Sequence, residues 1–296
     1  MQNGSSYLHI LIPAYNEFER LPKTLKSLCD YSLVCFERYA LSRIHIHVID
    51  DHSRDASFIQ FSQACTQALK EHCPAYGDKI ELHCYQNSSK QGKGQALNYL
   101  LEHASLLLER KAQAARDFVL LLDADLELCA GRCFALLEPL IKQEADLVIA
   151  AFAKAEPEHE TGHKDQRSNK TKKRGFGQVL KRARKELAES EQLYNYPQRY
   201  WQSPLSGQRA LSLNTLYNLS PLAPGFAVEL MMSKKAIQLH LRIHEMSLKL
   251  SHRQTGKSLG DILHRLRQYL DIEAALKTRD LAKHEPKAAE GGQGRS

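Results

Sequence analysis

Hydrophobic residues in the first half of the chain gather in short runs that alternate with longer amphipathic stretches. Short runs rich in Ile, Val and Leu are typical of β-strands, whereas apolar residues three and four positions apart are typical of helices. The short runs predict strands at 8–13, 44–49, 80–85, 118–122 and 147–152. The amphipathic stretches predict helices at 19–31, 55–71, 94–111, 178–193 and 259–277.

The order of these elements predicts an α/β fold. Strands that alternate with helices form mainly parallel sheets with helices on both faces. The run at 118–122 is apolar at every position, as expected for a central strand that is covered on both sides.

The alternation stops after residue 153, and three further parts follow. Residues 154–176 are polar and basic, and we expect a flexible loop there. Residues 177–279 mix helix with strand and predict a smaller α+β region. Residues 280–296 end in a glycine-rich stretch and are expected to form a disordered tail.

Composition and charge restrict the possible cellular location of the protein. The 296 residues are 43% hydrophobic and 25% charged, which is ordinary for a soluble globular protein. Ten basic residues and one acid lie between Lys164 and Lys185, either as a solvated face or as a surface that attracts phosphate-rich partners. No apolar stretch approaches the roughly 20 residues of a transmembrane helix, and residues 1–6 do not resemble a signal peptide.

The seven cysteines are odd in number and contain no C-x-x-C pair. They are therefore expected to be reduced thiols, as in cytosolic proteins. Together these features predict a cytoplasmic protein without a transmembrane segment, and contact with the inner membrane face is compatible with the basic stretch.

Two carboxylates directly follow the apolar strand at 118–122. Asp123 and Asp125 lie one residue apart at the carboxyl end of that strand, where open α/β sheets bind their ligands. Oxygen ligands with this spacing suit a hard divalent cation that neutralises a diphosphate. Aspartate also favours ordinary turns, so this pair does not decide the function alone.

Three further polar segments are expected at the same sheet edge. They are Pro-Ala-Tyr-Asn-Glu at 13–17, Asp-Asp-His-Ser-Arg-Asp at 50–55, and the loop at 87–94 with Lys93 between two glycines. Asn, Asp and Glu can bond a ribose or a base, and glycines beside a helix start let backbone approach a phosphate. The four segments together predict a nucleotide site.

These segments, in this order and spacing, resemble the GT-A (Rossmann-like) glycosyltransferases of family 2. The matching stretches are 13–17, 48–55, 92–97 and 122–125. In the second half, stretches 175–177, 204–210, 223–229 and 251–253 are similar to the branch of that family that contains glucosyl-3-phosphoglycerate synthase. The resemblance spans about residues 7–270.

The resemblance implies a hexosyltransferase whose residues 1–153 bind a nucleoside-diphosphate sugar, UDP-glucose above all, and whose residues 177–279 face the acceptor. It implies donor binding by Pro13, Ala14, Tyr15, Glu17, Asp50, Asp51, Lys93, Asp123 and Ala124. It implies a Mg²⁺ or Mn²⁺ ion on Asp125 and His252, since one imidazole beside oxygen ligands suits either ion. Catalytic roles would fall to Asp125, Lys93 and Glu229, the last as an orienting group or a general base.

The acceptor side would include Gly207, Gln208, Arg209 and Gly225. The sequence departs from the synthase branch at Gln178 and Leu180, where the branch carries an Arg and a Thr that hold the phosphate of phosphoglycerate. An amide and an aliphatic side chain cannot make those charge-assisted bonds. Asp51 also replaces the small Ser of that branch. The acceptor is therefore left as a small phosphorylated or hydroxylated molecule.

Three alternatives stay open at this point. A polyprenyl-phosphate glycosyltransferase at the cytoplasmic membrane face would use the basic stretch to contact anionic lipid. A nucleotidyltransferase of similar fold would open with a Gly-rich, Arg-containing loop, which 13–17 is not. A non-catalytic or nucleic-acid-binding protein would need stacking aromatics, and Phe176 is the only aromatic residue from 164 to 185. The sugar, the stereochemistry and the oligomeric state, a homodimer included, are not determined.

Overall fold

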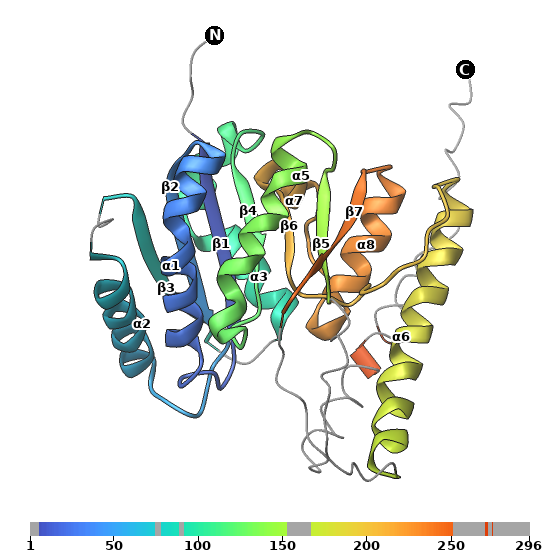
Figure 1. Cartoon of the computed structure of the whole chain (residues 1–296), viewed down its shortest axis with the longest axis horizontal. Coiled ribbons are helices and arrows are strands. Elements are labelled where there is room, and N and C mark those ends of the chain that lie inside the picture. The colour runs from blue at the N-terminus through green and yellow to red at the C-terminus, as the bar shows by residue number, and fades with distance from the viewer. Residues whose placement is uncertain are drawn as a thin grey trace, which may run out of the picture.

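The structure, a computed structural model, describes residues 6–74, 78–88, 92–152, 167–250, 270–271 and 274, with residues 167–176 described by their backbone only. The described chain is built on one seven-stranded sheet of order β3-β2-β1-β4-β6-β5-β7 (Figure 1). The strands are β1 (Ser6–Ala14), β2 (Leu41–Asp50), β3 (Ile80–Gln86), β4 (Phe118–Leu121), β5 (Leu147–Phe152), β6 (Arg209–Ser212) and β7 (Ile243–Leu248).

Helices follow most of the strands. The α-helices are α1 (Leu21–Tyr39), α2 (Phe58–His72), α3 (Lys93–His103), α4 (Ser105–Glu109), α5 (Leu137–Ile141), α6 (Arg167–Leu193), α7 (Leu213–Leu219) and α8 (Val228–Gln238). Short 3-10 helices are η2 (Arg110–Gln113), η3 (Glu127–Leu136) and η4 (Gly225–Ala227). Among the described pairings only those of β6, with β4 and β5, are antiparallel, which confirms the predicted mainly parallel sheet.

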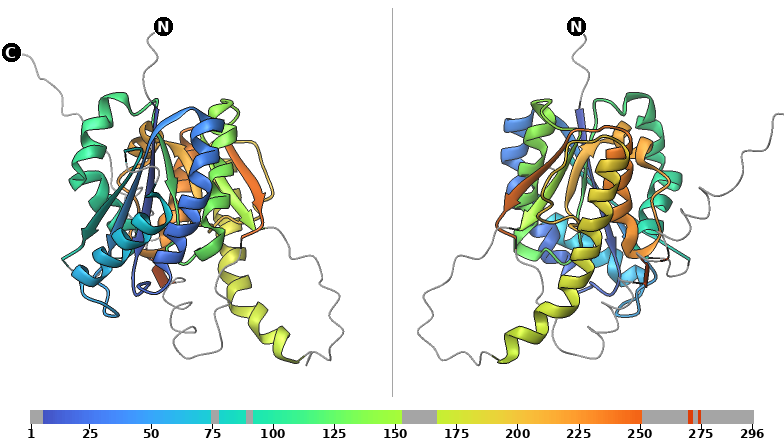
Figure 2. Two further views of the ribbon diagram at one scale, coloured as in Figure 1. Left: turned by 60° about the vertical axis from the view of Figure 1, so that its left-hand side comes forward. Right: turned by 90° about the vertical axis from the view of Figure 1, so that its right-hand side faces the viewer.

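Helices cover both faces of the sheet (Figure 2). Helices α1, α2 and α5 with η3 bury one face through residues such as Leu25, Phe61 and Phe134. Helices α3, α4, α6, α7 and α8 bury the other, with Leu97 and Leu230 in the second cluster. Since the central strands are apolar on both faces, each face can hold its own core.

The register brings three loops to one sheet edge. Ala14 at the end of β1 pairs with Asp50 at the end of β2, and Leu11 pairs with Leu121 at the end of β4. β1, β2 and β4 run downward in Figure 1, so the segments that follow them start at the lower edge of the sheet. This is the edge at which the sequence predicts the site.

Several predicted boundaries are wrong for local reasons. Helix α2 begins at Phe58 rather than 55, because Ser57 and Gln60 form a reciprocal capping box. Helix α1 continues to Tyr39 because Ser32 and Cys35 extend its buried stripe beyond 31. The predicted helix at 94–111 is divided into α3, α4 and η2 by the extended backbone of Ala104.

The second half differs more from the prediction. Helix α6 starts at Arg167, so the loop predicted over 154–176 is wrong for its last ten residues, and residues 154–166 lie outside the described ones. The predicted helix at 259–277 lies outside them except for residues 270, 271 and 274, and so does the predicted tail at 280–296. None of the described helices combines the length and the apolar character that a bilayer-crossing segment needs.

A disulfide joins α1 to the end of α2. Cys29 and Cys73 are bonded, with their Cα atoms 5.7 Å apart, whereas Cys35, Cys65, Cys84, Cys129 and Cys133 are free. The expectation that all seven cysteines are reduced thiols is therefore wrong for this pair.

Candidate functional site

Lys93 is at the centre of a charged cluster at the carboxyl edge of the sheet. Its Nζ lies 2.6 Å from Oδ1 of Asp123 and 2.7 Å from Oε1 of Glu229. The second oxygen of Asp123 accepts a 2.6 Å hydrogen bond from the amide of Gln208. Three segments far apart in sequence, at the starts of α3 and α8 and at the end of β4, therefore meet around one ammonium group.

Burial and the neighbouring carboxylates have opposite effects on the pKa of Lys93. The side chain of Lys93 is 15% exposed, and this burial alone would lower its pKa. The carboxylates of Asp123 and Glu229 outweigh it and raise the pKa of Lys93 above its ordinary value. Lys93 is consequently a permanent cation at neutral pH.

Glycines allow this close approach. A Cβ on Gly207 would lie 2.4 Å from Nζ of Lys93 and 2.5 Å from both carboxylate oxygens of Asp123. A Cβ on Gly94 would lie 1.8 Å from the carbonyl oxygen of Ala223, so the start of α3 packs directly on the 223–225 turn. Gly225 has a φ of 60° and donates its N–H to Oε1 of Gln95.

Asp50 and Asp51, predicted donor-binding residues, are both buried at the end of β2. Asp50 accepts from the backbone of Ser53 at 3.0 Å and from the amide of Gln86 at 3.1 Å. Asp51 accepts from the amide of Asn87 at 2.9 Å and from the N–H of Gly92 at 2.8 Å. Asp51 thus positions the residue that precedes Lys93.

The segment after β1 is tied to the segment after β2. Asn16 donates its backbone N–H to the Ser53 hydroxyl and accepts from the N–H of Arg54. Asp55 accepts from the N–H of Phe18 at 2.9 Å. Pro13, Ala14, Tyr15 and Glu17 therefore lie on the same edge as Asp50, and the carboxylate of Glu17 contacts Arg20.

Thr24 of α1 fixes the turn that follows β4. The hydroxyl of Thr24 donates to the carbonyl of Ala124 at 2.8 Å and accepts from the N–H of Glu127 at 2.8 Å. Ala124 is buried, whereas Asp123 and Asp125 are partly exposed. The fixed turn presents the two carboxylates at the edge, and Asp125 contributes to the raised pKa of Arg20, after the larger effects of Glu17.

Arg209 does not belong to an acceptor-facing surface, and that prediction is wrong. The side chain is fully buried, and its guanidinium donates to the carbonyls of Ser206 and Pro204 and to the hydroxyl of Ser233. Burial lowers the pKa of Arg209 to about 10, against the raising effect of Glu229. Arg209 instead fixes the loop that carries Gly207 and Gln208.

The structure brings Lys93, Asp123, Glu229 and Gln208 into direct contact, with Gly207 packed against them. Gln208 and Gly207, which were predicted on the acceptor side, contact Asp123. Gly225 donates its N–H to Gln95 of α3. His252 lies outside the described residues. Thr24 was not predicted, since an isolated polar residue in a helix gives no sequence signal for a partner 100 residues away.

The arrangement is suited to binding an anion beside a cation site. Lys93 is the first residue of α3, and the start of a helix favours binding of a phosphate group. Both oxygens of Asp123 already accept hydrogen bonds, one from Lys93 and one from Gln208.

Comparisons with known proteins agree with this fold. The sequence profile of glycosyl transferase family 2 matches residues 9–191. A comparison with curated protein sequences finds no match. Solved structures of glucosyl-3-phosphoglycerate synthase from Mycobacterium tuberculosis are similar over most of the chain.

Three of those structures show how similar the sequences and folds are. The complex with Mn²⁺, UDP and glucosyl-3-phosphoglycerate is 19% identical, with 93% of this chain and 80% of that chain covered and a TM-score of 0.55. The complex with Mg²⁺ and UDP is 18% identical, with 93% and 79% covered and a TM-score of 0.55. The complex with Mn²⁺, UDP-glucose and phosphoglyceric acid is 20% identical, with 93% and 80% covered and a TM-score of 0.54. The likeness is one of fold, and it confirms the predicted GT-A architecture.

Proposed function

The chain belongs to glycosyl transferase family 2, and we propose that it transfers a hexose, glucose from UDP-glucose in the first instance, to a small phosphorylated or hydroxylated acceptor. The observation that carries this proposal is the contact of Lys93 with both Asp123 and Glu229 at the carboxyl edge of the sheet. The solved synthases of the same fold bind UDP and UDP-glucose, which makes a uridine nucleotide the first donor to test.

The nucleoside end of the donor is assigned to the linked loops after β1 and β2. Pro13, Ala14 and Tyr15 would line the base and ribose, with Glu17 and Asp50 as polar contacts. The hydrogen bonds between residues 16–18 and 53–55 support this assignment, because they preorganise the pocket before a ligand enters.

The diphosphate is assigned to Lys93 and the start of α3. The ammonium group of Lys93 has three N–H donors, and Asp123 and Glu229 accept two of them, so one is left to donate to a phosphate oxygen. Those carboxylates would then accept from hydroxyl groups of the sugar, so that donor binding and sugar orientation occur together. Glu229 has a further role as orienting group for the acceptor hydroxyl, or as the base that takes its proton.

A divalent cation fits the residues that remain. Asp125 offers a partly exposed carboxylate one residue beyond Asp123, and His252 is the second ligand implied by the family motif. An oxygen and a nitrogen ligand with positions left for phosphate suit Mn²⁺ or Mg²⁺, the ions present in the solved synthases. Such an ion would stabilise the negative charge of the leaving diphosphate.

The acceptor class stays broad for a structural reason. Gln178 is exposed on α6 and next to the buried Val179, so this turn of the helix presents an amide where the synthase branch carries an Arg. A phosphorylated acceptor would need another cation, and Lys181 lies one turn further along the same helix.

A donor screen tests the proposal. UDP-, GDP- and ADP-sugars and, separately, nucleoside triphosphates are added with Mn²⁺ or Mg²⁺, and thermal shift and slow hydrolysis of the donor are measured. The expected result is stabilisation by UDP-glucose only when the metal ion is present. Stabilisation by a nucleoside triphosphate and by none of the nucleotide sugars would contradict a glycosyltransferase and favour a nucleotidyltransferase.

A further inference from the structure

Four histidines lie in a row on one face of the sheet, away from the donor site. His9 is on β1, His45 and His47 are on β2, and His83 is on β3. The register pairs His9 with His45 and His47 with His83. The first three are at most 2% exposed, and the rings of His47 and His83 stack at 4.9 Å between centroids.

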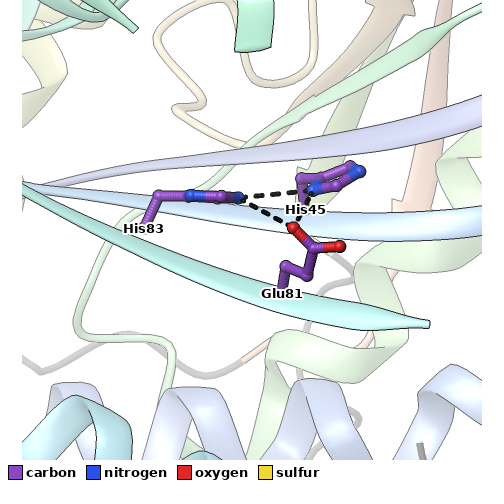
Figure 3. Close-up of side chains that lie close together, drawn as sticks. All are labelled: His45, Glu81 and His83. Atoms are coloured by element: carbon purple, nitrogen blue, oxygen red, sulfur yellow. Dashed lines mark hydrogen bonds and ion pairs between the residues drawn. The ribbon is translucent and has the colours of Figure 1, made fainter. Parts of the chain in front are cut away.

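Three ligand atoms of this row converge on one point. Nδ1 of His45 lies 3.3 Å from Nε2 of His83 and 3.6 Å from Oε2 of Glu81, and Nε2 of His83 lies 3.8 Å from the same oxygen (Figure 3). A tetrahedral ion with bonds of about 2.0–2.1 Å holds its ligands about 3.3–3.5 Å apart. The three atoms therefore already have nearly the spacing of three zinc ligands, and they form a group able to hold a metal.

Hydrogen bonds satisfy only one ring nitrogen of each buried imidazole in the row, because His9 Nδ1 pairs with His47 Nε2 and His45 Nδ1 pairs with His83 Nε2. Within the described part of the chain, Nε2 of His45 and Nδ1 of His47 have no hydrogen-bond partner, whereas Nε2 of His9 lies 3.7 Å from Oδ2 of Asp117. Buried polar groups without hydrogen-bond partners are unfavourable, so a row of such imidazoles indicates a role beyond packing.

We propose that His45, Glu81 and His83 bind a transition-metal ion of the zinc class, with water at the fourth position. Two imidazoles and one carboxylate suit Zn²⁺ and Co²⁺ and do not suit Ca²⁺ or Mg²⁺, which prefer oxygen ligands. His83 and Glu81 are 28% and 37% exposed, so the ion can enter from solvent at the sheet edge.

The site is independent of the proposed donor site. Asp50 follows His45 by five residues along β2, which is about 16 Å of strand. β3 is the edge strand of the sheet. An ion held by His45 on β2 and by Glu81 and His83 on β3 would fix this edge strand to its neighbour β2. Its effect is expected on stability rather than on donor binding.

Cobalt binding tests this proposal. The full-length protein is used with Asp125→Ala, because this substitution removes a proposed ligand of the donor-site metal ion. The protein is freed of metal with a chelator and titrated with Co²⁺. We expect one Co²⁺ per chain with the visible absorption of a tetrahedral nitrogen and oxygen site, no thiolate charge-transfer band, and displacement by Zn²⁺. Zn²⁺ should also raise the Tm.

Three variants in the same background complete the test. His83→Ala and Glu81→Gln alter partly exposed side chains and should fold, which far-UV circular dichroism checks. Each should raise the dissociation constant for Co²⁺ about tenfold or more, because losing a ligand weakens a site at least as much as losing a supporting residue. His103→Ala, an exposed histidine on α3, is the matched control and should bind as before. Absence of the cobalt spectrum, a thiolate band, or binding unchanged in His83→Ala would overturn the proposal.

Discussion

At the scale of single residues, Gly207 sets the geometry of the charged cluster because it has no side chain. A methyl group there would overlap Nζ of Lys93 and both oxygens of Asp123. We expect Gly207→Ala to separate this ion pair and to weaken UDP-glucose binding about tenfold, which corresponds to about 1.4 kcal/mol. Isothermal titration calorimetry measures the change.

Gly177→Ala is the matched control for that substitution. Gly177 lies in α6, and a Cβ there would meet nothing within 4 Å. The alanine should leave donor binding unchanged and stabilise the protein slightly, since glycine is unfavourable inside a helix. Equal donor affinity in both variants would show that Gly207 does not shape the donor site.

The site residues that could be predicted are those carried by contiguous motifs. Asp123, Asp125 and Lys93 follow a strand or open a helix, so their place at the sheet edge can be inferred from the pattern alone. The assignment of Arg209 to the acceptor side came from the family resemblance alone, which does not reveal that two carbonyls and a hydroxyl satisfy its guanidinium inside the protein. The contact of Lys93 with Glu229 joins residues 136 positions apart and could not be deduced from spacing.

At the scale of elements, a buried ion pair fixes where β4 begins. Asp117 is fully buried, accepts two 2.7 Å bonds from Arg110 in η2 and accepts from the N–H of Tyr7 in β1 at 3.0 Å. Asp117→Asn leaves Arg110 without its charge partner, and we expect the free energy of unfolding to fall by about 2–3 kcal/mol at pH 7. Urea denaturation measures this loss.

The effect of Asp117→Asn should depend on pH with a defined sign. Burial alone would raise the pKa of Asp117, but the hydrogen bonds from Arg110 and others outweigh it and hold that pKa below its ordinary value. The stabilisation is therefore present above about pH 4 and is lost as the pH falls through the folded-state pKa. Asp30→Asn, in an exposed pair with Lys26, should change stability by less than about 0.5 kcal/mol. A loss that does not shrink in acid would contradict this account.

Element boundaries were predictable where local chemistry marks them. The five predicted strands exist, because each is a short segment rich in apolar residues. Strand β6 was missed since two of its four residues, Arg209 and Ser212, are polar, and its antiparallel place between β4 and β5 depends on the rest of the sheet. The last part of α1 was missed because Ser32 and Cys35 give a weak apolar signal.

At the scale of the whole molecule, the number of thiols is a direct check of the fold. Alkylation of the denatured, unreduced chain should label five cysteines, and reduction should release two more, Cys29 and Cys73. The disulfide closes a loop of 44 residues, so reduction should lower stability by about 4 kcal/mol in the chain-entropy model. Seven labelled thiols before reduction would contradict the α1–α2 link.

The account as a whole depends on a diphosphate site shared by the Asp123–Asp125 turn and the start of α3. The most direct test is calorimetric titration of UDP into the wild type and Asp125→Ala, each with Mn²⁺ and with EDTA, and with Glu144→Ala as an exposed acidic control. We predict that Mn²⁺ strengthens UDP binding to the wild type and to Glu144→Ala, and that Asp125→Ala keeps its fold and loses this dependence. Mn²⁺-dependent binding that persists unchanged in Asp125→Ala would contradict the assignment.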